Sequence, residues 1–194
     1  MKALFTLILT CFVFVISSNK IVFAQTECKA TEVFEVGDTA TYKSRLMPIL
    51  KCEALKNLTI QITQNKGWVV FSSVQGNDFG FRYSAKLNLV ALLEDLGIAK
   101  NLESLEVSDL GIDYLPESMV DLVNLQSLDI GFNKLNVSKE LPKINSLSNL
   151  KVLKIYGCIF TEDDLETIRK QLPNVTILYS QNHLIEEFKA RNKK

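Results

Sequence analysis

The sequence predicts an α/β solenoid, in which short parallel strands stack side by side and the chain returns behind them. The first observation is a spacing: an aliphatic motif begins at Leu102, Leu125, Leu150 and Val175, at intervals of 23, 25 and 25 residues. The second is that aliphatic and polar residues alternate inside each motif, which is the period of a strand with one buried face. The third is that a short segment with apolar residues on one side follows each motif. Such a chain buries its aliphatic residues between successive turns.

The motif itself is specific. Its three complete copies cover residues 102–112, 125–135 and 150–160, and residues 175–180 open a fourth. The pattern L-x-x-L-x-L-x-x-N/C-x-L resembles the leucine-rich repeat family over residues 86–182. The resemblance implies a right-handed solenoid with parallel strands on the concave face and short helices on the convex face. It also implies a ligand-binding concave face and a protein that is not an enzyme.

The first 24 residues have the composition of a secretory signal peptide. Lys2 gives a basic start, residues 3–16 form an apolar run, and Val22 and Ala24 stand where a cleavage site before Gln25 needs small or medium residues. The run falls short of the roughly 20 apolar residues that span a bilayer, so an uncleaved anchor is the weaker alternative. Lipid attachment at Cys11 is a second alternative. We expect a small secreted, periplasmic or cell-surface protein, typical of bacteria.

Charge narrows the class of partner. The chain carries 22 basic and 22 acidic residues, and removal of residues 1–24 deletes Lys2 and Lys20 and no acid. The remainder has 20 basic and 22 acidic residues, or a net charge of −2. This balance favours neither nucleic acid nor an anionic membrane. We expect a protein or peptide partner and no cofactor. Residues 183–194 are locally basic, and we interpret them as a solvated tail.

Three cysteines remain after residue 24. Cys28 and Cys52 flank a short N-terminal segment, and export permits disulfides, so we pair them. Closing that loop stabilises the fold by about 3 kcal/mol in the chain-entropy model. Cys158 is left over, and its position inside the third repeat gives it a structural place.

Residues 25–85 do not carry the leucine pattern, and we interpret them as a β-rich N-terminal cap over the first repeat. Residues 58–63 alternate apolar and polar side chains, and residues 68–71 and 79–83 read as two further strands after turns. Together they predict an antiparallel meander. Residues 33–42 add a hairpin around Gly37. Residues 87–96 then predict a helix that Gly97 ends.

Convex segments complete the repeats over residues 86–182. Leu115 with Pro116, and Leu141 with Pro142, begin the segments behind the first and second repeats. The third segment predicts the clearest helix, because Thr161 and Asp164 have the spacing of a capping box and Pro173 stops it.

Strand alternation divides each repeat into buried and displayed positions. The displayed residues form three columns along the predicted concave face. The central column is Glu106, Asp129, Lys154 and Tyr179; one flank is Ser104, Ser127, Val152 and Ile177; the other is Ser108, Gly131, Tyr156 and Gln181. Tyrosine is enriched in binding hot spots, so we expect Tyr156, Tyr179 and Lys154 to contribute most to ligand binding. The alternative is an ordinary solvated sheet face.

The ninth motif position normally carries a polar residue that bonds the backbone of a neighbouring repeat. Asn133 fits this ladder role, and Cys158 is the common substitute because it is small and tolerates burial. Leu110 and His183 depart from the pattern. Cys158 and His183 occupy equivalent positions in adjacent repeats, so a thiolate–imidazole dyad is a remote catalytic alternative.

These observations favour one function over two others. The leading hypothesis is a secreted binding module that recognises a protein or a surface ligand through its concave face. The second is a structural solenoid that supports a functional N-terminal β cap. The third is a hydrolase that uses Cys158 and His183. No metal site is expected, because two such ligands are fewer than zinc requires.

Overall fold

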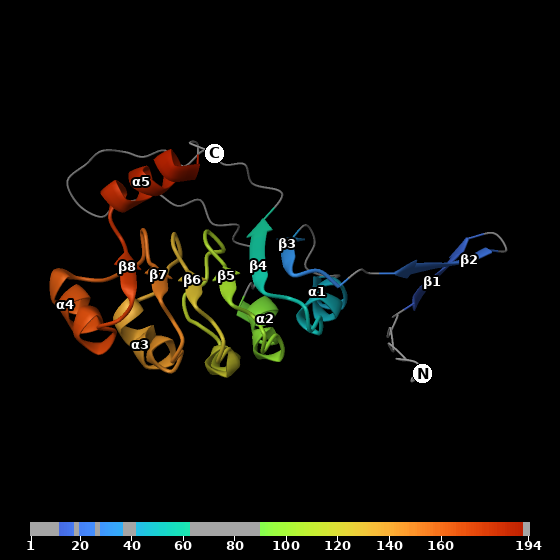
Figure 1. Cartoon of the computed structure of the whole chain (residues 1–194), viewed down its shortest axis with the longest axis horizontal. Helices are drawn as coiled ribbons and strands as arrows, with labels where there is room; N and C mark the ends of the chain where they lie inside the picture. Colours follow the sequence, from blue (N-terminus) through green and yellow to red (C-terminus); the bar gives the residue numbers. More distant parts are fainter. Residues whose placement is uncertain (1–11, 18–19, 26–27, 37–41, 63–89, 192–194) are drawn as a thin grey trace, which may run out of the picture.

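A computed structural model describes residues 12–17, 20–25, 28–36, 42–62 and 90–191 of the 194-residue chain. Strands β1 (Phe12–Ser17) and β2 (Lys20–Gln25) pair with each other in antiparallel fashion and form a two-stranded sheet of their own. This pair lies within and just beyond the predicted signal peptide, whose cleavage stays a prediction. All other strands within the described residues belong to one sheet (Figure 1).

That second sheet is the solenoid which the period predicts. Its six strands follow chain order and are all parallel, and they are β3 (Thr31–Val36), β4 (Asn57–Ile62), β5 (Ser104–Glu106), β6 (Ser127–Asp129), β7 (Val152–Lys154) and β8 (Thr176–Leu178). Leu105 pairs with Leu128, and Leu128 pairs with Leu153. The stacking of these three leucines confirms the α/β leucine-rich repeat fold class.

Short helices connect the strands, and they line up along one side of the sheet (Figure 1). They are α1 (Tyr42–Leu50), α2 (Val90–Leu93), the 3-10 helices η1 (Leu96–Ile98) and η2 (Glu117–Asp121), α3 (Val137–Asn145) and α4 (Glu162–Gln171). Their inner residues, such as Leu93, Met119, Ile144 and Ile168, are buried against the inward leucines of the strands. The convex layer therefore closes one continuous core.

The capping box at α4 is present as predicted. The Asp164 amide donates to Thr161 Oγ1 at 3.1 Å, and the Thr161 amide donates to Asp164 Oδ2 at 2.8 Å. Ser138 of α3 also donates to Asp164 and thereby links two neighbouring convex helices. These bonds hold the pKa of the Asp164 carboxyl below its ordinary value, with the Ser138 hydroxyl as the largest cause.

Gly97 has a different role from the predicted one. It lies inside η1 and is buried, whereas the sequence placed it just beyond the end of a longer helix. A Cβ atom at this position would meet the Ser118 carbonyl oxygen at 2.5 Å. Glycine is therefore required because η1 and η2 approach each other closely, and not because a helix ends there.

The N-terminal region differs from the predicted meander. Strand β4 has parallel neighbours on both sides, β3 and β5, and α1 lies between β3 and β4 in the chain. The hairpin expected over residues 33–42 is wrong, because β3 ends at Val36 and α1 begins at Tyr42. The two strands expected at residues 68–71 and 79–83 lie outside the described residues. The boundary at residue 86 stays a prediction, while β3 and β4 extend the sheet of the repeats.

Each repeat turns from strand to convex side through a left-handed residue. Asp109, Phe132 and Gly157 have φ angles of 55°, 56° and 63°, and each stands directly before the ninth motif position. A positive φ is uncommon for any residue with a side chain and costs backbone strain. The same turn thus recurs in three repeats, although only the third uses glycine.

Candidate functional site

The sheet register defines the outward face of the solenoid. Ser104, Ser127 and Val152 lie opposite one another in one row, and Glu106, Asp129 and Lys154 lie in the next. None of these side chains is buried as deeply as the intervening leucines. On β5, β6 and β7 the outward residues of these two columns therefore lie as the sequence predicts.

The fourth rung is shifted by one residue. Thr176 pairs with Val152, Ile177 with Leu153 and Leu178 with Lys154. Ile177 and Tyr179 accordingly pack against the core, and Leu178 takes the place expected for Tyr179. The shift arises because the last strand begins directly after the first motif position, Val175, whereas each earlier strand begins one residue later. The Lys151 carbonyl oxygen accepts from the Thr176 amide. The equivalent carbonyl oxygen, that of Glu103, accepts from both the Gln126 and the Ser127 amides. The expected outward placement of Ile177 and Tyr179 is wrong.

Tyr179 serves the end of the solenoid instead. Its ring meets Phe160 edge-on at 6.1 Å and His183 edge-on at 5.3 Å. The Arg169 guanidinium donates to its hydroxyl at 3.0 Å and lies 5.4 Å from its ring centre. These contacts join β8 to the convex side and to the C-terminal helix.

That C-terminal helix replaces the expected tail. Helix α5 (Gln181–Arg191) follows β8 after two residues and lies above the ends of the last strands (Figure 1). Gln181 begins this helix, so it does not join the sheet column in which the sequence placed it. Of the basic residues expected in the tail, Lys189 therefore stands on a helix whose Glu187 contacts the sheet.

Helix α5 reduces the accessibility of the other two favoured binding residues, Tyr156 and Lys154. Tyr156 is only 4% exposed; its ring stacks on Phe132 at 6.2 Å, and its hydroxyl donates to Glu187 Oε2 at 3.2 Å. Lys154 Nζ lies 2.7 Å from Glu187 Oε1 and 3.7 Å from Asp129 Oδ2. Both side chains point outward from the sheet, but both already bind the Glu187 carboxylate of the same chain.

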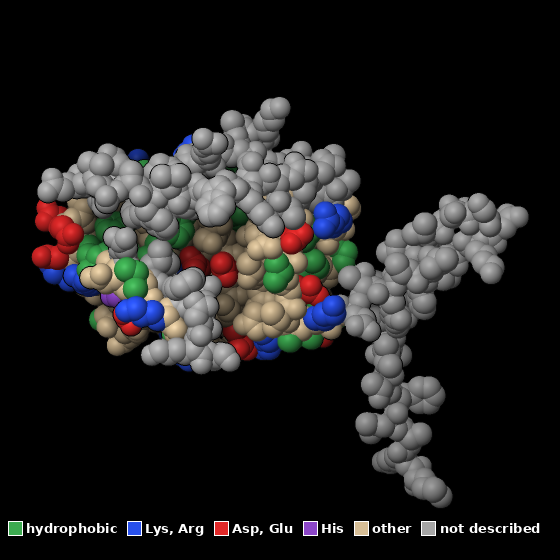
Figure 2. Space-filling model, turned by 90° about the horizontal axis from the view of Figure 1, so that it is seen from above, with side chains coloured by type: hydrophobic (Ala, Val, Ile, Leu, Met, Phe, Trp, Pro, Cys, Tyr) green, Lys and Arg blue, Asp and Glu red, His purple; other side chains and the backbone are tan. Residues whose placement is uncertain are grey.

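Acidic groups dominate the middle of the face. Thr59 and Ser108 donate to the two carboxylate oxygens of Glu106, at 3.4 and 3.5 Å, and the Gly131 amide donates to Asp129 Oδ1 at 3.0 Å. Burial raises the pKa of Asp129, the Gly131 bond and Lys154 oppose that rise, and Glu106 and Glu187 add to it. Figure 2 shows acidic side chains near the centre of the molecule in this view.

Strands β3 and β4 supply concave residues that the sequence analysis missed. Their outward side chains, which alternate with buried ones, are Thr31, Val33, Glu35, Asn57, Thr59 and Gln61. Asn57 Nδ2 donates to Thr31 Oγ1 and Gln61 Nε2 donates to Glu35 Oε1, each at 3.1 Å, while Val33 is 52% exposed. The signal was available, because Leu55, Leu58 and Ile60 repeat the first, fourth and sixth positions of the motif.

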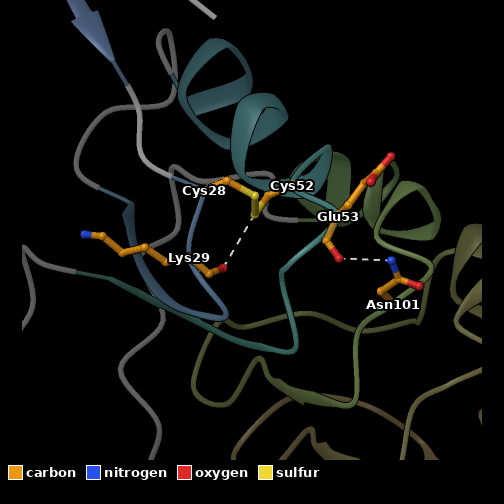
Figure 3. Close-up of a disulfide and its surroundings, with 5 residues drawn as sticks. All are labelled: Cys28, Lys29, Cys52, Glu53 and Asn101. Atoms are coloured by element: carbon orange, nitrogen blue, oxygen red, sulfur yellow. Dashed lines mark hydrogen bonds between the residues drawn. A yellow bond between two sulfur atoms is a disulfide. The ribbon is translucent and has the colours of Figure 1, made fainter. Parts of the chain in front are cut away.

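The predicted disulfide is present at this end of the sheet. Cys28 and Cys52 are bonded, with their Cα atoms 5.4 Å apart (Figure 3). Next to it, Asn101 Nδ2 donates to the Glu53 carbonyl oxygen at 3.0 Å. The bridge fixes the start of β3 to the end of α1, and the asparagine ties this unit to the first leucine motif.

Asn133 is the centre of the polar ladder. It is 1% exposed, its Oδ1 accepts from the amides of Leu110 and Ile112 at 3.0 and 3.3 Å, and its Nδ2 donates to Val107 O at 2.8 Å and Ile130 O at 2.9 Å. One side chain thus joins two repeats through their backbones.

Cys158 takes the equivalent place one repeat later, where its thiol donates to Ile130 O at 3.3 Å. Burial raises the pKa of this thiol to about 12, although a hydrogen bond from the backbone amide of Asn133 acts in the opposite direction. His183 Nδ1 accepts from the Tyr179 amide at 3.3 Å. A neutral thiol is a poor nucleophile, so this geometry gives the hydrolase hypothesis no support.

Two further features bear on chemistry and location. Within the described ranges, no group of three or more His, Cys, Asp or Glu side chains is arranged to hold a metal ion. The helices of that same part of the chain are all too short or too polar to cross a bilayer.

Comparison with known proteins found similar solved structures but no matching family. No family model matches it, and no curated protein matches it. A solved leucine-rich repeat protein of Leptospira interrogans is similar at 23% identity and a TM-score of 0.43, over 66% of this chain and 26% of that one. An internalin from Listeria monocytogenes is similar at 16% identity and a TM-score of 0.29, over 70% and 44%. The chain spans about a quarter of the first protein and less than half of the second.

Proposed function

We propose that this protein is a secreted interaction module that binds a protein or peptide ligand on the concave face of its sheet, mainly over β3 to β6. The observation that supports it is an unbroken row of outward side chains across six parallel strands. Repeat solenoids present extended surfaces of this kind to their partners.

The two ends of the face differ in accessibility. At the β7 end, Lys154 and the following Tyr156 are covered through Glu187 of α5. On β3 and β4, Val33 and the neighbouring polar side chains are exposed. A ligand therefore meets the β3 to β6 half first, where small hydroxyl and amide groups surround the Glu106 carboxylate.

Export is supported by two independent features. The predicted signal peptide would direct the chain out of the cytoplasm, and a structural disulfide such as Cys28–Cys52 persists in oxidising compartments. Mass determination of the protein from its own host tests this: we expect a mature chain that begins at Gln25 and retains the disulfide. A chain that keeps Met1 and both thiols would contradict it.

Substitutions on the two faces test the binding surface. Val33→Arg and Thr59→Arg each place a bulky cation on the outward face, while Thr167→Arg places one on the exposed side of convex helix α4. A partner captured from surface extracts of the protein's own environment should lose at least tenfold in affinity for the first two variants and keep its affinity for the third. Equal binding by all three would move the site away from this face.

The structural-spacer hypothesis has less support. It requires an N-terminal module that works on its own, but β3 and β4 are rungs of the same sheet as the leucine motifs. Two polar contacts also connect this region to the first leucine motif. They are the hydrogen bond from Asn101 to the Glu53 carbonyl oxygen and an ion pair between Lys56 and Glu103 at 2.6 Å. The place of β3 and β4 in that sheet favours a single binding surface over a separate N-terminal module.

A further inference from the structure

Two donors from the third leucine motif, Lys154 and Tyr156, hold one carboxylate from the C-terminal helix. Lys154 Nζ lies 2.7 Å from Glu187 Oε1, and Tyr156 Oη donates to Glu187 Oε2 at 3.2 Å. Lys154 ends β7 and Tyr156 follows two residues later in the turn, and both side chains reach the same carboxylate of α5. Each carboxylate oxygen has its own donor, which fixes both the position and the orientation of the group.

The contact is sheltered from water. The side chains of Lys154 and Glu187 are 14% and 25% exposed, and Tyr156 is buried. Charge-assisted bonds are stronger in such surroundings than on an open surface. By contrast, the next residue, Glu186, is exposed and pairs with Lys189 of its own helix at 2.9 Å. Only one of two adjacent glutamates is therefore directed at the sheet.

The first turn of α5 is anchored separately. The Tyr179 amide donates to His183 Nδ1, and the His183 amide donates to Ser180 Oγ. Among the described side chains further along the helix, Ile185, Lys189 and Ala190 are exposed. The helix is thus fixed where it leaves β8, and Glu187 is the described polar link between its later turns and the sheet.

We propose that Lys154 and Tyr156 form a recognition site for the glutamate side chain of an acidic partner peptide, and that Glu187 of α5 occupies this site in the free protein. The inference rests on the proposed function, since it names the chemical group that the concave face takes at its β7 end. A partner displaces Glu187 by presenting a carboxylate of its own to the same two donors.

The neighbouring charges limit the ligand to a single carboxylate. Asp129 Oδ2 already lies 3.7 Å from Lys154 Nζ, and Glu106 precedes Asp129 in the same row of the sheet. A second acidic group placed beside the first would meet these two carboxylates with no further cation in the row. The site therefore selects a peptide with one well-placed glutamate over a run of acidic residues.

Tethering sets the affinity that can be measured. Two residues, Tyr179 and Ser180, join α5 to β8, so Glu187 competes at the high local concentration of a short linker, on the order of millimolar. An external peptide binds only the fraction of molecules in which the site is open. Weakening the internal contact should therefore strengthen external binding, which is the opposite of what a purely structural contact predicts.

The probe is a fluorescein-labelled peptide with the sequence of residues 181–191, acetylated and amidated, and binding to the full chain is followed by anisotropy. We expect Glu187→Gln to bind it at least tenfold more tightly than the unaltered chain does, while Glu186→Gln, the matched control, behaves like the unaltered chain. A second peptide with glutamine in place of Glu187 should bind Glu187→Gln at least tenfold more weakly. Equal affinities across the chains, or across the two peptides, would overturn the proposal.

Hydrogen exchange on the unaltered chain gives a readout that does not depend on the folding of a variant. Excess acidic peptide should deprotect the amides of α5, and the glutamine peptide should not. Unchanged protection under both peptides would also overturn the proposal. Because neither experiment uses the natural partner, a failure here leaves the capture experiment with Val33→Arg and Thr59→Arg unaffected, and the reverse holds as well.

Discussion

Replacing Asn133 by alanine should be among the most damaging single changes in this chain. Its amide makes five hydrogen bonds, to the amides of Leu110 and Ile112 and to the carbonyl oxygens of Val107, Ile130 and Gly131. Alanine removes all five and leaves the buried Leu110 and Ile112 amides without this acceptor.

The cost can be worked from those groups. An unsatisfied buried donor costs about 1–3 kcal/mol, so two orphaned amides and the lost carbonyl bonds together cost roughly 3–5 kcal/mol. Domains of this size are stable by only about 5–15 kcal/mol. With a urea slope of about 2 kcal/mol per molar, the unfolding midpoint should fall by roughly 2 M.

Urea unfolding followed by circular dichroism measures this directly. Asn133→Cys should lose less than Asn133→Ala, because Cys158 shows that a thiol can donate to the corresponding carbonyl oxygen. Asn145→Ala, at an exposed position of α3, is the control and should change stability by less than about 0.5 kcal/mol. A loss below about 1 kcal/mol for Asn133→Ala would refute the ladder argument.

Three other predictions concern titratable and sulfur groups. The Cys158 thiol, with a pKa of about 12, should resist a thiol reagent at pH 7 in the native chain and react at once in urea; rapid native labelling would contradict its burial. Folding raises the pKa of Asp129 above its unfolded value, so the ionised group opposes folding at neutral pH and this penalty vanishes as the pH falls below the unfolded pKa. Asp129→Asn should therefore stabilise the chain at pH 7 and lose that advantage near pH 3 in urea titrations, and a pH-independent difference would refute the assignment. The double change Cys28→Ser and Cys52→Ser should cost about 3 kcal/mol in thermal unfolding, and an unchanged melting temperature would show that the bridge adds nothing.

The spacing of the repeats was enough to predict the central part of the fold. Leucines at 105, 128 and 153 recur at the repeat length, and the residues that flank them, all polar except Val152, mark the outward side. Strand alternation then fixes which side chains are displayed, so the rows of Ser104 and Glu106 follow from sequence alone. The same reasoning fixes the ladder position of Asn133.

The last rung shows where the pattern ceases to decide. Residues 175–178 read Val-Thr-Ile-Leu, so two adjacent aliphatic residues compete for one inward position. A one-residue slip moves every side chain to the other face. Backbone pairing of Thr176 with Lys151 settles the choice in favour of Ile177. Pairing between strands is a long-range interaction that the local pattern does not contain.

The C-terminal helix was hidden for a related reason. Residues 183–194 contain acidic and basic groups without a clear apolar stripe, which is typical of a solvated tail. What holds Glu187 in place is Lys154, more than thirty residues earlier, together with Tyr156. Only the folded sheet brings these groups together, and with them it changes which residues a ligand can reach.

The bridge between Cys28 and Cys52 determines from which end the repeats should unfold. In a stack where each turn is bound only to its neighbours, fraying starts at whichever terminus is held more weakly. The N-terminal end of the stack is locked by a covalent bond, whereas the C-terminal end is closed by helix α5, which the contacts of Glu187 hold in place. Under tension or protease attack the turns should come apart in order from the carboxyl end, and the covalently locked turn should be the last to open.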